Sequence, residues 1–301
     1  MNGKMPHIVQ YQGSKRKLAP QILQYMPAKF NRLIEPFAGM AAITIATASE
    51  NMAEHYIIND LNAPLLGILK EAVENPERIV EEYRYIWNEQ FSYKNHILHF
   101  YDIRESFNNG DESPAKLLYL LARCVKGSVR YGKNGKFNQS PDKRRHGTNP
   151  DTIAKNIYII SGLLKGKASF FSTDYREMLA KACPGDIVYM DPPYQGVSGN
   201  GDCRYLKGVS FQEFAESLDI LNKKGADYII SYDGSCGDKQ YGCDLPESLG
   251  CKKIMLKAGL STQALLLGNK NITMEALYIS RGLIPVYNSV PKQLLFTEAF
   301  A

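Results

Sequence analysis

Paired cysteines, a long apolar run and an excess of one charge are all missing from this chain. Its six cysteines among 301 residues include no Cys-x-x-Cys pair, the spacing typical of zinc ribbons. We therefore interpret Cys236, Cys243 and Cys251 as reduced thiols and expect no metal. No run of eighteen apolar residues occurs, and residues 1–18 contain no apolar segment typical of a signal peptide. These absences favour a reduced, cytoplasmic setting.

Charge and composition are those of an ordinary folded chain. Lys and Arg number 36 against 31 Asp and Glu, so the net charge is only +5, and 44% of residues are hydrophobic. This balance excludes a histone-like polycation and a strongly acidic solvating protein. The length predicts one or two domains with a sizeable core.

Short apolar segments alternate with helical patterns along most of the chain. The helical pattern at 211–225 is one example, and the last two apolar segments are expected to pair antiparallel. Strands that alternate with helices predict an α/β fold with a mostly parallel sheet covered on both faces. The predicted strands are 32–37, 55–60, 169–174, 186–194, 228–235, 252–258 and 275–280.

The alternation stops between about residues 64 and 165. Three segments of this stretch have helical periodicity, and a basic segment follows them. Asn134-Gly135 marks that basic segment as a short hairpin with polar strands. In the helical segments, Trp87 is expected in the core, and His96 and His99 on the surface rather than on a metal. We predict a catalytic domain at 1–63 and 166–284, an inserted helical subdomain at 64–165, and an irregular tail at 285–301.

The strand that ends in Asp191-Pro192-Pro193-Tyr194 carries the sharpest chemical signal. An acid at the carboxyl end of a strand lies where open α/β sheets bind ligands. The two prolines hold the chain extended and remove backbone donors. The Asp191 carboxylate and the Pro192 carbonyl then form two rigid acceptors beside an aromatic ring, which suits the exocyclic amine of a flat base. A plain strand-ending turn is the alternative, because Asp-Pro is common in turns.

A second signal indicates a nucleoside-type cofactor. Gly39 follows a strand and precedes a helix, where a glycine allows the backbone to approach a ligand closely. Asp60 ends the next strand about twenty residues later, a spacing that suits ribose hydroxyls. Neither a glycine-rich pyrophosphate fingerprint nor a P-loop motif is present, which argues against NAD and nucleoside triphosphates.

Taken together, these motifs resemble the DNA adenine methyltransferase (Dam) family, the D12 class and alpha group of N6-adenine-specific DNA methylases. Tyr-Gln-Gly-Ser-Lys (11–15) is similar to the family's N-terminal aromatic-x-Gly-Gly-Lys motif. EPFAGMAA resembles its cofactor loop, IIND its ribose-binding acid, STDY the acid near the cofactor adenine, and DPPY its catalytic motif. The resemblance implies a Rossmann-like, S-adenosylmethionine-dependent methyltransferase fold. It implies cofactor contacts at Tyr11, Lys15, Phe37, Gly39, Asp60, Asp174 and Asp191.

The resemblance also implies the reaction. A methyl group would pass from S-adenosylmethionine to N6 of an adenine that has left the duplex, without a metal, leaving S-adenosylhomocysteine. Asp191 and Pro192 would bind the amine, and Tyr194 would stack on the base.

The basic hairpin resembles the family's DNA-reading hairpin. Between Arg123 and His146 there are eight basic residues and one acid, Asp142. Arginine and lysine bind phosphates, and arginine also reads guanine edges, although a solvated charged loop is the alternative. The expected contacts with double-stranded DNA are Lys126, Arg130, Lys133, Lys136, Asn138, Lys143, Arg144 and Arg145.

Departures from the family pattern bear on specificity. Ser14 and Ala41 stand where glycine is usual, a small-for-small change. Lys126 and Ser128 replace residues that the family uses on target bases, so we expect a target other than GATC that still contains adenine. Two alternatives stay open: an N4-cytosine DNA methylase, which more often has Ser before the prolines, and a catalytically silent DNA-binding protein. A modification methylase beside a cognate restriction endonuclease is the expected setting.

Overall fold

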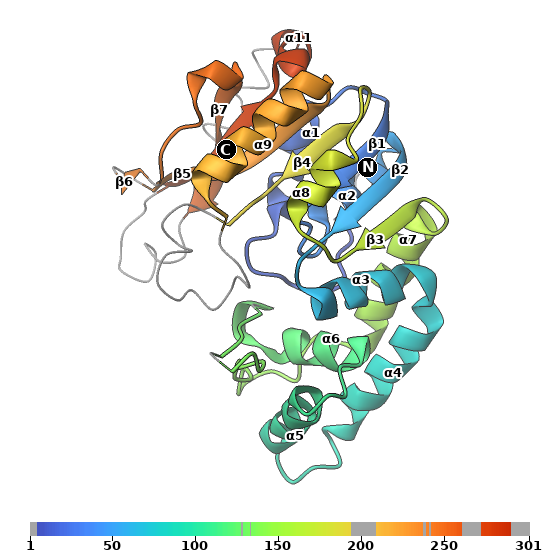
Figure 1. Cartoon of the computed structure of the whole chain (residues 1–301). Coiled ribbons are helices and arrows are strands. Elements are labelled where there is room, and N and C mark those ends of the chain that lie inside the picture. The colour runs from blue at the N-terminus through green and yellow to red at the C-terminus, as the bar shows by residue number, and fades with distance from the viewer. Residues whose placement is uncertain are drawn as a thin grey trace.

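The computed structural model describes residues 5–127, 129–132, 134–193, 209–236, 239–240, 242–260 and 272–289. These residues form a central sheet with helices on both faces, and a group of helices extends from one end of it (Figure 1). No helix within these ranges is long and apolar enough to cross a membrane.

The sheet is mostly parallel, as predicted, and its strand order is β3-β2-β1-β4-β5-β8-β7, with a short β6 beside β5. Strands β1 to β5 are parallel to one another, whereas β8 pairs antiparallel with both β5 and β7. Strand β4, Ile-Val-Tyr-Met, is buried throughout, as expected of a parallel strand covered on both faces. The strands are β1 Phe30–Glu35, β2 Ala53–Asn59, β3 Ala168–Phe171, β4 Ile187–Met190, β5 Asp227–Cys236, β6 Lys239–Gln240, β7 Lys252–Leu260 and β8 Ile272–Ile279.

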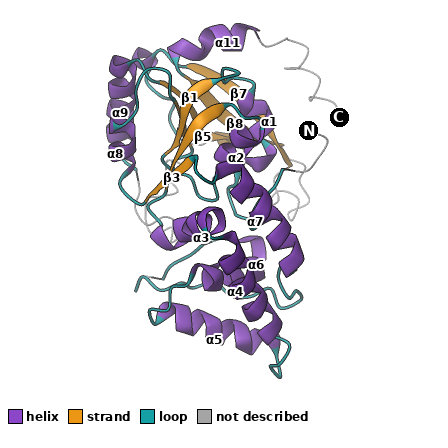
Figure 2. Cartoon of the chain, turned by 90° about the vertical axis from the view of Figure 1, so that its right-hand side faces the viewer, coloured by secondary structure: helices purple, strands orange, loops and turns teal. Residues whose placement is uncertain are grey.

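Helices cover both faces of the sheet (Figure 2). Helices α1 (Ala19–Leu23) and α2 (Ala42–Ser49) lie on one face, and α8 (Tyr175–Ala180) and α9 (Phe211–Lys224) on the other. Ser210 caps α9, and Gly225 ends it in the left-handed conformation. The predicted helix at 211–225 and the predicted fold class are therefore confirmed.

The stretch predicted to be helical contains five α-helices, and two isolated β-bridges lie between the fourth and the fifth of them among its described residues. One apolar core runs from the sheet face under α2 into this helical group, so the helices are packed onto the sheet rather than tethered to it. The division of the chain into two domains stays a prediction. The helices are α3 Ala63–Glu74, α4 Pro76–Glu89, α5 His96–Asn108, α6 Pro114–Arg123 and α7 Pro150–Leu164.

Two backbone expectations need correction. The chain from residue 285 was expected to be irregular, but Ile284–Ser289 form helix α11. Pro285 lies in its first turn, where a proline is tolerated. The Tyr287 ring stacks on Tyr25 with centroids 6.0 Å apart, which explains the order there. The basic hairpin has no extended strands among its described residues, which form two isolated bridges, one between Tyr131 and Phe137 and one between Cys124 and Pro141 at its base.

The environment of one histidine also differs from the expectation. His99 was expected on the surface, yet it is fully buried, and its Nδ1 lies 2.9 Å from the Tyr119 hydroxyl. Helix α5 packs against α6, and this contact between helices is invisible in the spacing of the histidines. Trp87 packs against the core, as expected. Among the cysteines, Cys124 is buried and Cys251 is half-buried. Cys183 and Cys243 are exposed, and for Cys243 this differs from the partly buried thiol expected within the group of Cys236, Cys243 and Cys251.

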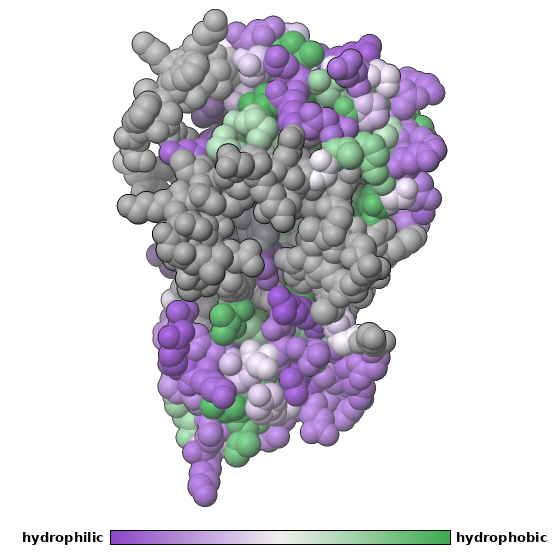
Figure 3. Space-filling model, turned by 90° about the vertical axis from the view of Figure 1, so that its left-hand side faces the viewer, coloured by the Kyte–Doolittle hydropathy of each residue, from purple (hydrophilic) through white to green (hydrophobic). Residues whose placement is uncertain are grey.

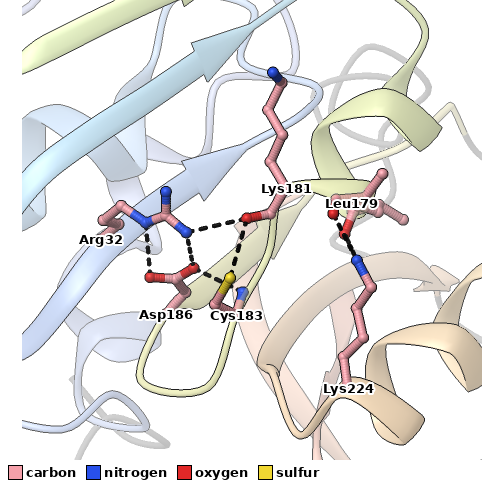
Figure 4. A network of polar contacts seen from close by, with 7 residues as sticks. Arg32, Leu179, Lys181, Cys183, Asp186 and Lys224 are labelled. Carbon is pink, nitrogen blue, oxygen red and sulfur yellow. Dashed lines mark hydrogen bonds and ion pairs between the residues drawn. The ribbon is translucent and has the colours of Figure 1, made fainter.

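An ion pair joins two strands at the amino end of the sheet (Figure 4). Asp186 comes directly before β4 and is only 2% exposed. Its carboxylate accepts hydrogen bonds from Arg32 Nε at 2.9 Å and Nη2 at 2.5 Å, and from the Cys183 backbone N–H at 2.9 Å. Arg32 Nη2 also donates to the Lys181 carbonyl at 3.0 Å. These contacts hold β1 to the turn before β4.

We expect Asp186→Asn to destabilise the fold without changing the chemistry at the other end of β4. Removing one partner of a buried ion pair costs about 3–5 kcal/mol. Because the Arg32 side chain is 32% exposed, water offsets part of this, and we expect about 2 kcal/mol. Thermal unfolding should show a midpoint lower by about 5 °C. An unchanged midpoint would show that the pair contributes nothing to stability.

Candidate active site and DNA interface

Three loops meet where the parallel strands β1, β2 and β4 end. Gly39 lies in the loop after β1, Asp60 directly follows β2, and Asp191 directly follows β4. Strand β1 lies between β2 and β4, so the chain order reverses there. Ligands of open α/β sheets bind at this kind of switch point, outside the carboxyl ends of the strands. The fold thus brings the two acids with the clearest sequence signals to one edge.

The Asp191 carboxylate pairs with a lysine from the N-terminal segment. Lys15 Nζ lies 2.8 Å from Asp191 Oδ1 and 2.9 Å from Oδ2. The same ammonium lies 3.2 Å from Oε1 of Glu275, which comes from β8. Burial raises the pKa of Asp191, and the Lys15 ammonium opposes that shift. Lys15, expected at the cofactor, therefore lies at the predicted catalytic acid, beside a second acid that the sequence did not single out.

The loop after β1 has the backbone that its glycine predicted. Gly39 has φ of +51°, and a Cβ there would lie 3.0 Å from Cε1 of Tyr11, so the Tyr11 ring packs directly on the loop. Ala41 also has a left-handed φ, +52°, although it carries a side chain. Glycine adopts this conformation without strain, which explains why it is usual there in the family. The shape of the loop therefore requires a strained backbone conformation at Ala41.

Asp60 fixes that loop through its own carboxylate. Asp60 Oδ2 accepts a hydrogen bond from the Gly39 backbone N–H at 2.8 Å, and Oδ1 accepts one from the Asn62 N–H at 2.9 Å. Burial raises the pKa of Asp60, and these two N–H donors oppose the rise. Each oxygen retains a second lone pair, so the carboxylate can also accept from ribose hydroxyls. Asp60 is therefore both a structural support for the loop and a candidate ligand for the cofactor.

Two asparagines beside Asp60 join further segments to this edge, and neither was expected. Asn59 donates to the carbonyls of Pro36 and Thr173 and accepts from the Thr173 N–H. Asn62 caps α3 and accepts a hydrogen bond at 3.0 Å from the hydroxyl of Tyr131 in the hairpin. The polar run Asn-Asp-Leu-Asn (59–62) directly after an apolar strand was the signal that could have identified them.

The two other predicted cofactor residues are Phe37, on the same loop as Gly39, and Asp174, at the start of α8. Phe37 follows β1, and its ring lies 5.1 Å from that of Tyr175, centroid to centroid. Asp174 caps α8, accepting from the Arg176 N–H, and forms an ion pair with the Arg176 guanidinium at 2.8 Å. The loop after β1 thus carries an aromatic ring beside Gly39, Asp60 contacts that loop, and Asp174 lies at the start of α8. This set of side chains fits S-adenosylmethionine.

Glu35, the last residue of β1, is a buried acid that carries an unusual proton affinity. Its Oε2 accepts hydrogen bonds from the Thr44 N–H at 3.0 Å and the Thr44 hydroxyl at 2.6 Å, in the first turn of α2. Burial raises the pKa of Glu35 to about 8, although both bonds from Thr44 oppose the rise. At neutral pH the side chain is therefore mostly protonated, and it holds α2 against β1.

The basic hairpin is anchored at both arms. Its turn follows the prediction: the Gly135 N–H donates to the Gly132 carbonyl, and Gly135 has φ of +73°. The second arm is held by Asn108 at the end of α5, whose amide exchanges two hydrogen bonds with the backbone of Phe137. At the hairpin base, a Cβ on Gly127 would lie only 1.8 Å from the Gln10 carbonyl oxygen. The hairpin therefore lies against the N-terminal segment that carries Tyr11 and Lys15.

Most of the predicted DNA contacts that the structure describes are exposed. Hydrophilic residues predominate around smaller apolar patches on this side of the helical group (Figure 3). Asp142 is buried beneath the basic run, and its carboxylate lies 3.5 Å from Arg144 Nε and 3.4 Å from Arg145 Nε. The exposed residues are Arg130, Lys136, Asn138, Lys143, Arg144 and Arg145.

One basic residue of this region does not belong to the exposed surface. Arg123 is 1% exposed, and its guanidinium donates to the backbone carbonyls of Asp142 and His96. It therefore supports the loop from inside instead of meeting DNA. Lys133, Tyr194 and the side chain of Lys126 lie outside the described part of the chain. Within the described part, no three His, Cys, Asp or Glu side chains form a group that could hold a metal ion.

We expect Glu35→Gln to change how stability depends on pH. A carboxyl group whose pKa rises from 4.5 in the unfolded chain to about 8 in the folded one stabilises the fold below the lower value. That contribution is lost as pH rises towards 8. The variant lacks this loss, so its free energy of unfolding should gain on the wild type by about 2–4 kcal/mol between pH 5 and 9. Urea unfolding at a series of pH values measures it, and a constant difference would contradict the raised pKa.

The chain is similar to known DNA adenine methyltransferases. Residues 11–262 match the family model described as D12 class N6 adenine-specific DNA methyltransferase. The retron Ec67 DNA adenine methylase of Escherichia coli is 30% identical over 75% of this chain and 77% of its own length. The type II methyltransferase M1.LlaDCHI of Lactococcus lactis subsp. cremoris is 29% identical over 74% and 79%, and a DNA adenine methylase of Serratia marcescens 28% identical over 64% and 68%. The chain belongs to the D12 class of N6-adenine-specific DNA methyltransferases, which act on DNA and use S-adenosylmethionine.

Proposed function

We propose that this methyltransferase modifies an adenine rotated out of the DNA duplex, with Asp191 and Pro192 as the groups that bind its amine. The observation that carries the proposal is the position of Asp191 at the end of β4, at the switch point of the sheet and beside the loops of Gly39 and Asp60. The amine is inaccessible within a helix, so the base has to leave the stack first.

The chain's own residues activate and position the nucleophile. The lone pair of an adenine amine is delocalised into the ring. Hydrogen bonds from N6–H to the Asp191 carboxylate and the Pro192 carbonyl draw that lone pair back onto nitrogen, and a fixed position contributes a large part of the rate. Asp191 or water accepts the amine proton after transfer. Tyr194 stacks on the base, a contact worth about 1–3 kcal/mol in single-stranded complexes.

The methyl donor is held by the loops at the same edge. S-adenosylmethionine supplies a methyl group that its sulfonium already activates, and S-adenosylhomocysteine remains after transfer. Asp60 binds the ribose hydroxyls of the cofactor while it keeps Gly39 in place. Asp174 and Phe37 contact the cofactor's adenine, and the Tyr11 ring packs on the loop of Gly39. Asp191 borders both ligands.

Support for DNA binding comes from the exposed basic side chains on and beyond the anchored hairpin. Arg130 lies on the hairpin and reads a base, whereas Lys143, Arg144 and Arg145 lie beyond it and bind phosphates. Lys126, Lys133, Lys136 and Asn138 complete the contact. We infer a target other than GATC and, given relatives from bacteria and from phage P1, a modification role in the cytoplasm of a prokaryotic or phage-infected cell. A cognate restriction endonuclease fits that role.

Asp191→Ala should abolish methyl transfer and leave DNA binding almost unchanged, because the carboxylate acts on the amine and the hairpin holds the duplex. DNA is digested to nucleosides after reaction with deuteromethyl S-adenosylmethionine, and the labelled nucleosides are identified by mass spectrometry. The wild type should yield labelled N6-methyladenine and no N4-methylcytosine. Asp186→Asn, at the other end of β4, is the matched control and should remain active below its unfolding temperature. Wild-type turnover in Asp191→Ala would refute the catalytic assignment, and labelled cytosine would refute the substrate.

Two sets of arginine variants should separate base reading from phosphate binding. Arg130→Ala should relax specificity at one position, since a good bidentate contact discriminates by about 1–3 kcal/mol. Arg144→Ala with Arg145→Ala should weaken binding to all sequences alike and flatten the salt dependence by about one unit for each phosphate that is no longer bound. Methylation-sensitive sequencing of DNA from an expressing host that lacks its own methylase gives the target. Methylation confined to GATC would overturn the inferred target, and a sequence-dependent loss in the double variant would overturn the phosphate role.

A further inference from the structure

Glu275 is a buried acid in the middle of a strand, a position where carboxylates are rare. It lies on β8, opposite Gly234 on β5 and Leu256 on β7, and is 7% exposed. Its Oε1 lies 3.2 Å from Lys15 Nζ, which also contacts both oxygens of Asp191. Two carboxylates from different strands therefore share one ammonium from the N-terminal segment.

We propose that Glu275 is a positioning residue for methyl transfer, which holds the Lys15 ammonium between two carboxylates so that Asp191 remains a strong acceptor for the adenine amine. The proposal rests on the proposed role of Asp191. An ammonium that contacted both oxygens of Asp191 alone would draw its electron density and weaken it as an acceptor. A second carboxylate on the same ammonium reduces that effect and gives the lysine another partner when the amine arrives.

The charges around Asp191 agree with this role. The groups that face it are Lys15 from the N-terminal segment, Glu275 from β8, Glu35 from β1 and Tyr189 from β4. Glu35 is mostly protonated at neutral pH, and burial raises the pKa of Tyr189, whose hydroxyl lies 2.8 Å from that of Ser231. Neither therefore supplies negative charge at pH 7. Glu275 raises the pKa of Asp191 against the lowering effect of Lys15.

A purely structural role for Glu275 predicts a different result from the positioning role. If Glu275 only stabilised the fold, its loss would lower the unfolding temperature and leave the pH dependence of the chemical step unchanged. If it sets the basicity of Asp191, its loss removes a negative charge from beside that carboxylate. Asp191 then ionises at lower pH and becomes a weaker acceptor.

The test compares Glu275→Gln and Glu275→Asp with Asp186→Asn. The control removes the charge of a buried, ion-paired acid at the opposite end of β4. Single-turnover methylation is measured from pH 5 to 9 with excess enzyme, saturating S-adenosylmethionine and long unmethylated DNA, which contains every short site. Cofactor affinity and the unfolding midpoint are measured beside it.

We expect Glu275→Gln to shift the acidic limb of the profile by about one unit to lower pH. The plateau rate should fall by up to about tenfold, since a weaker base gives a proportionally weaker contribution. Glu275→Asp keeps the charge but moves it one methylene away from Lys15, so its limb should shift in the same direction by a smaller amount. Asp186→Asn should unfold at lower temperature without a shift of the limb.

An unmoved limb in Glu275→Gln, with a rate loss no larger than that of Asp186→Asn, would overturn the proposal. If Glu275→Gln does not fold, Glu275→Asp decides, because its shorter side chain should move the limb slightly in the same direction, and an unmoved limb and plateau would overturn the proposal. An inactive Asp191→Ala together with an unmoved limb removes the role of Glu275 alone. An active Asp191→Ala removes the role of Asp191 itself.

Discussion

The ion pair between Lys15 and Asp191 determines how the N-terminal segment lies against the sheet. Both groups are largely shielded from water, and a buried charge without a partner costs several kcal/mol, so the pair holds residues 11–15 across the carboxyl edge. From that position the Tyr11 ring covers Gly39, and the Gln12 N–H donates to the Gly127 carbonyl at the hairpin base. The loop after β1, the proposed catalytic acid Asp191 and the base of the basic hairpin are thereby placed by one segment.

A second set of hydrogen bonds connects the hairpin to the cofactor loop. The Tyr131 hydroxyl binds the Asn62 side chain, the Asn62 N–H binds Asp60, and Asp60 binds the N–H of Gly39. The apolar core is continuous between the sheet and the helical group, so the two parts support each other. Methyl transfer requires the base and the methyl donor in one fixed geometry, and a rigid connection between the segments proposed to bind them serves this requirement.

The sequence predicted much of the fold and of the candidate site, because its clearest signals are local. Apolar runs that end in an acid mark parallel strands and their ligand-binding ends, and this pattern alone predicts Asp60 and Asp191 at one edge of the sheet. The turn at Gly135 and the helix at 211–225 follow from equally local rules. The family resemblance added the identity of the reaction and the role of the hairpin.

What the sequence did not predict depends on contacts between distant segments. Glu275 lies within a strand and meets Lys15 across 260 positions of chain, so nothing beside it marks it as part of the site. Arg123 is one of the basic residues of the basic segment, which suggests an exposed position, yet helix packing buries it. The same packing buries His99. Asp174 and Asp60 were chosen as ligands, but their additional work as a helix cap and a loop support appears only in three dimensions.

A structure of the enzyme with S-adenosylhomocysteine and a target duplex measures the central contact directly, through the distances from the extruded adenine N6 to Asp191 and Pro192. We expect N6 to lie within about 3.2 Å of an Asp191 carboxylate oxygen and of the Pro192 carbonyl oxygen. Lys15 should remain in contact with Glu275. An extruded adenine whose N6 donates hydrogen bonds to other groups, while Lys15 still contacts both oxygens of Asp191, would contradict the proposed role of Asp191.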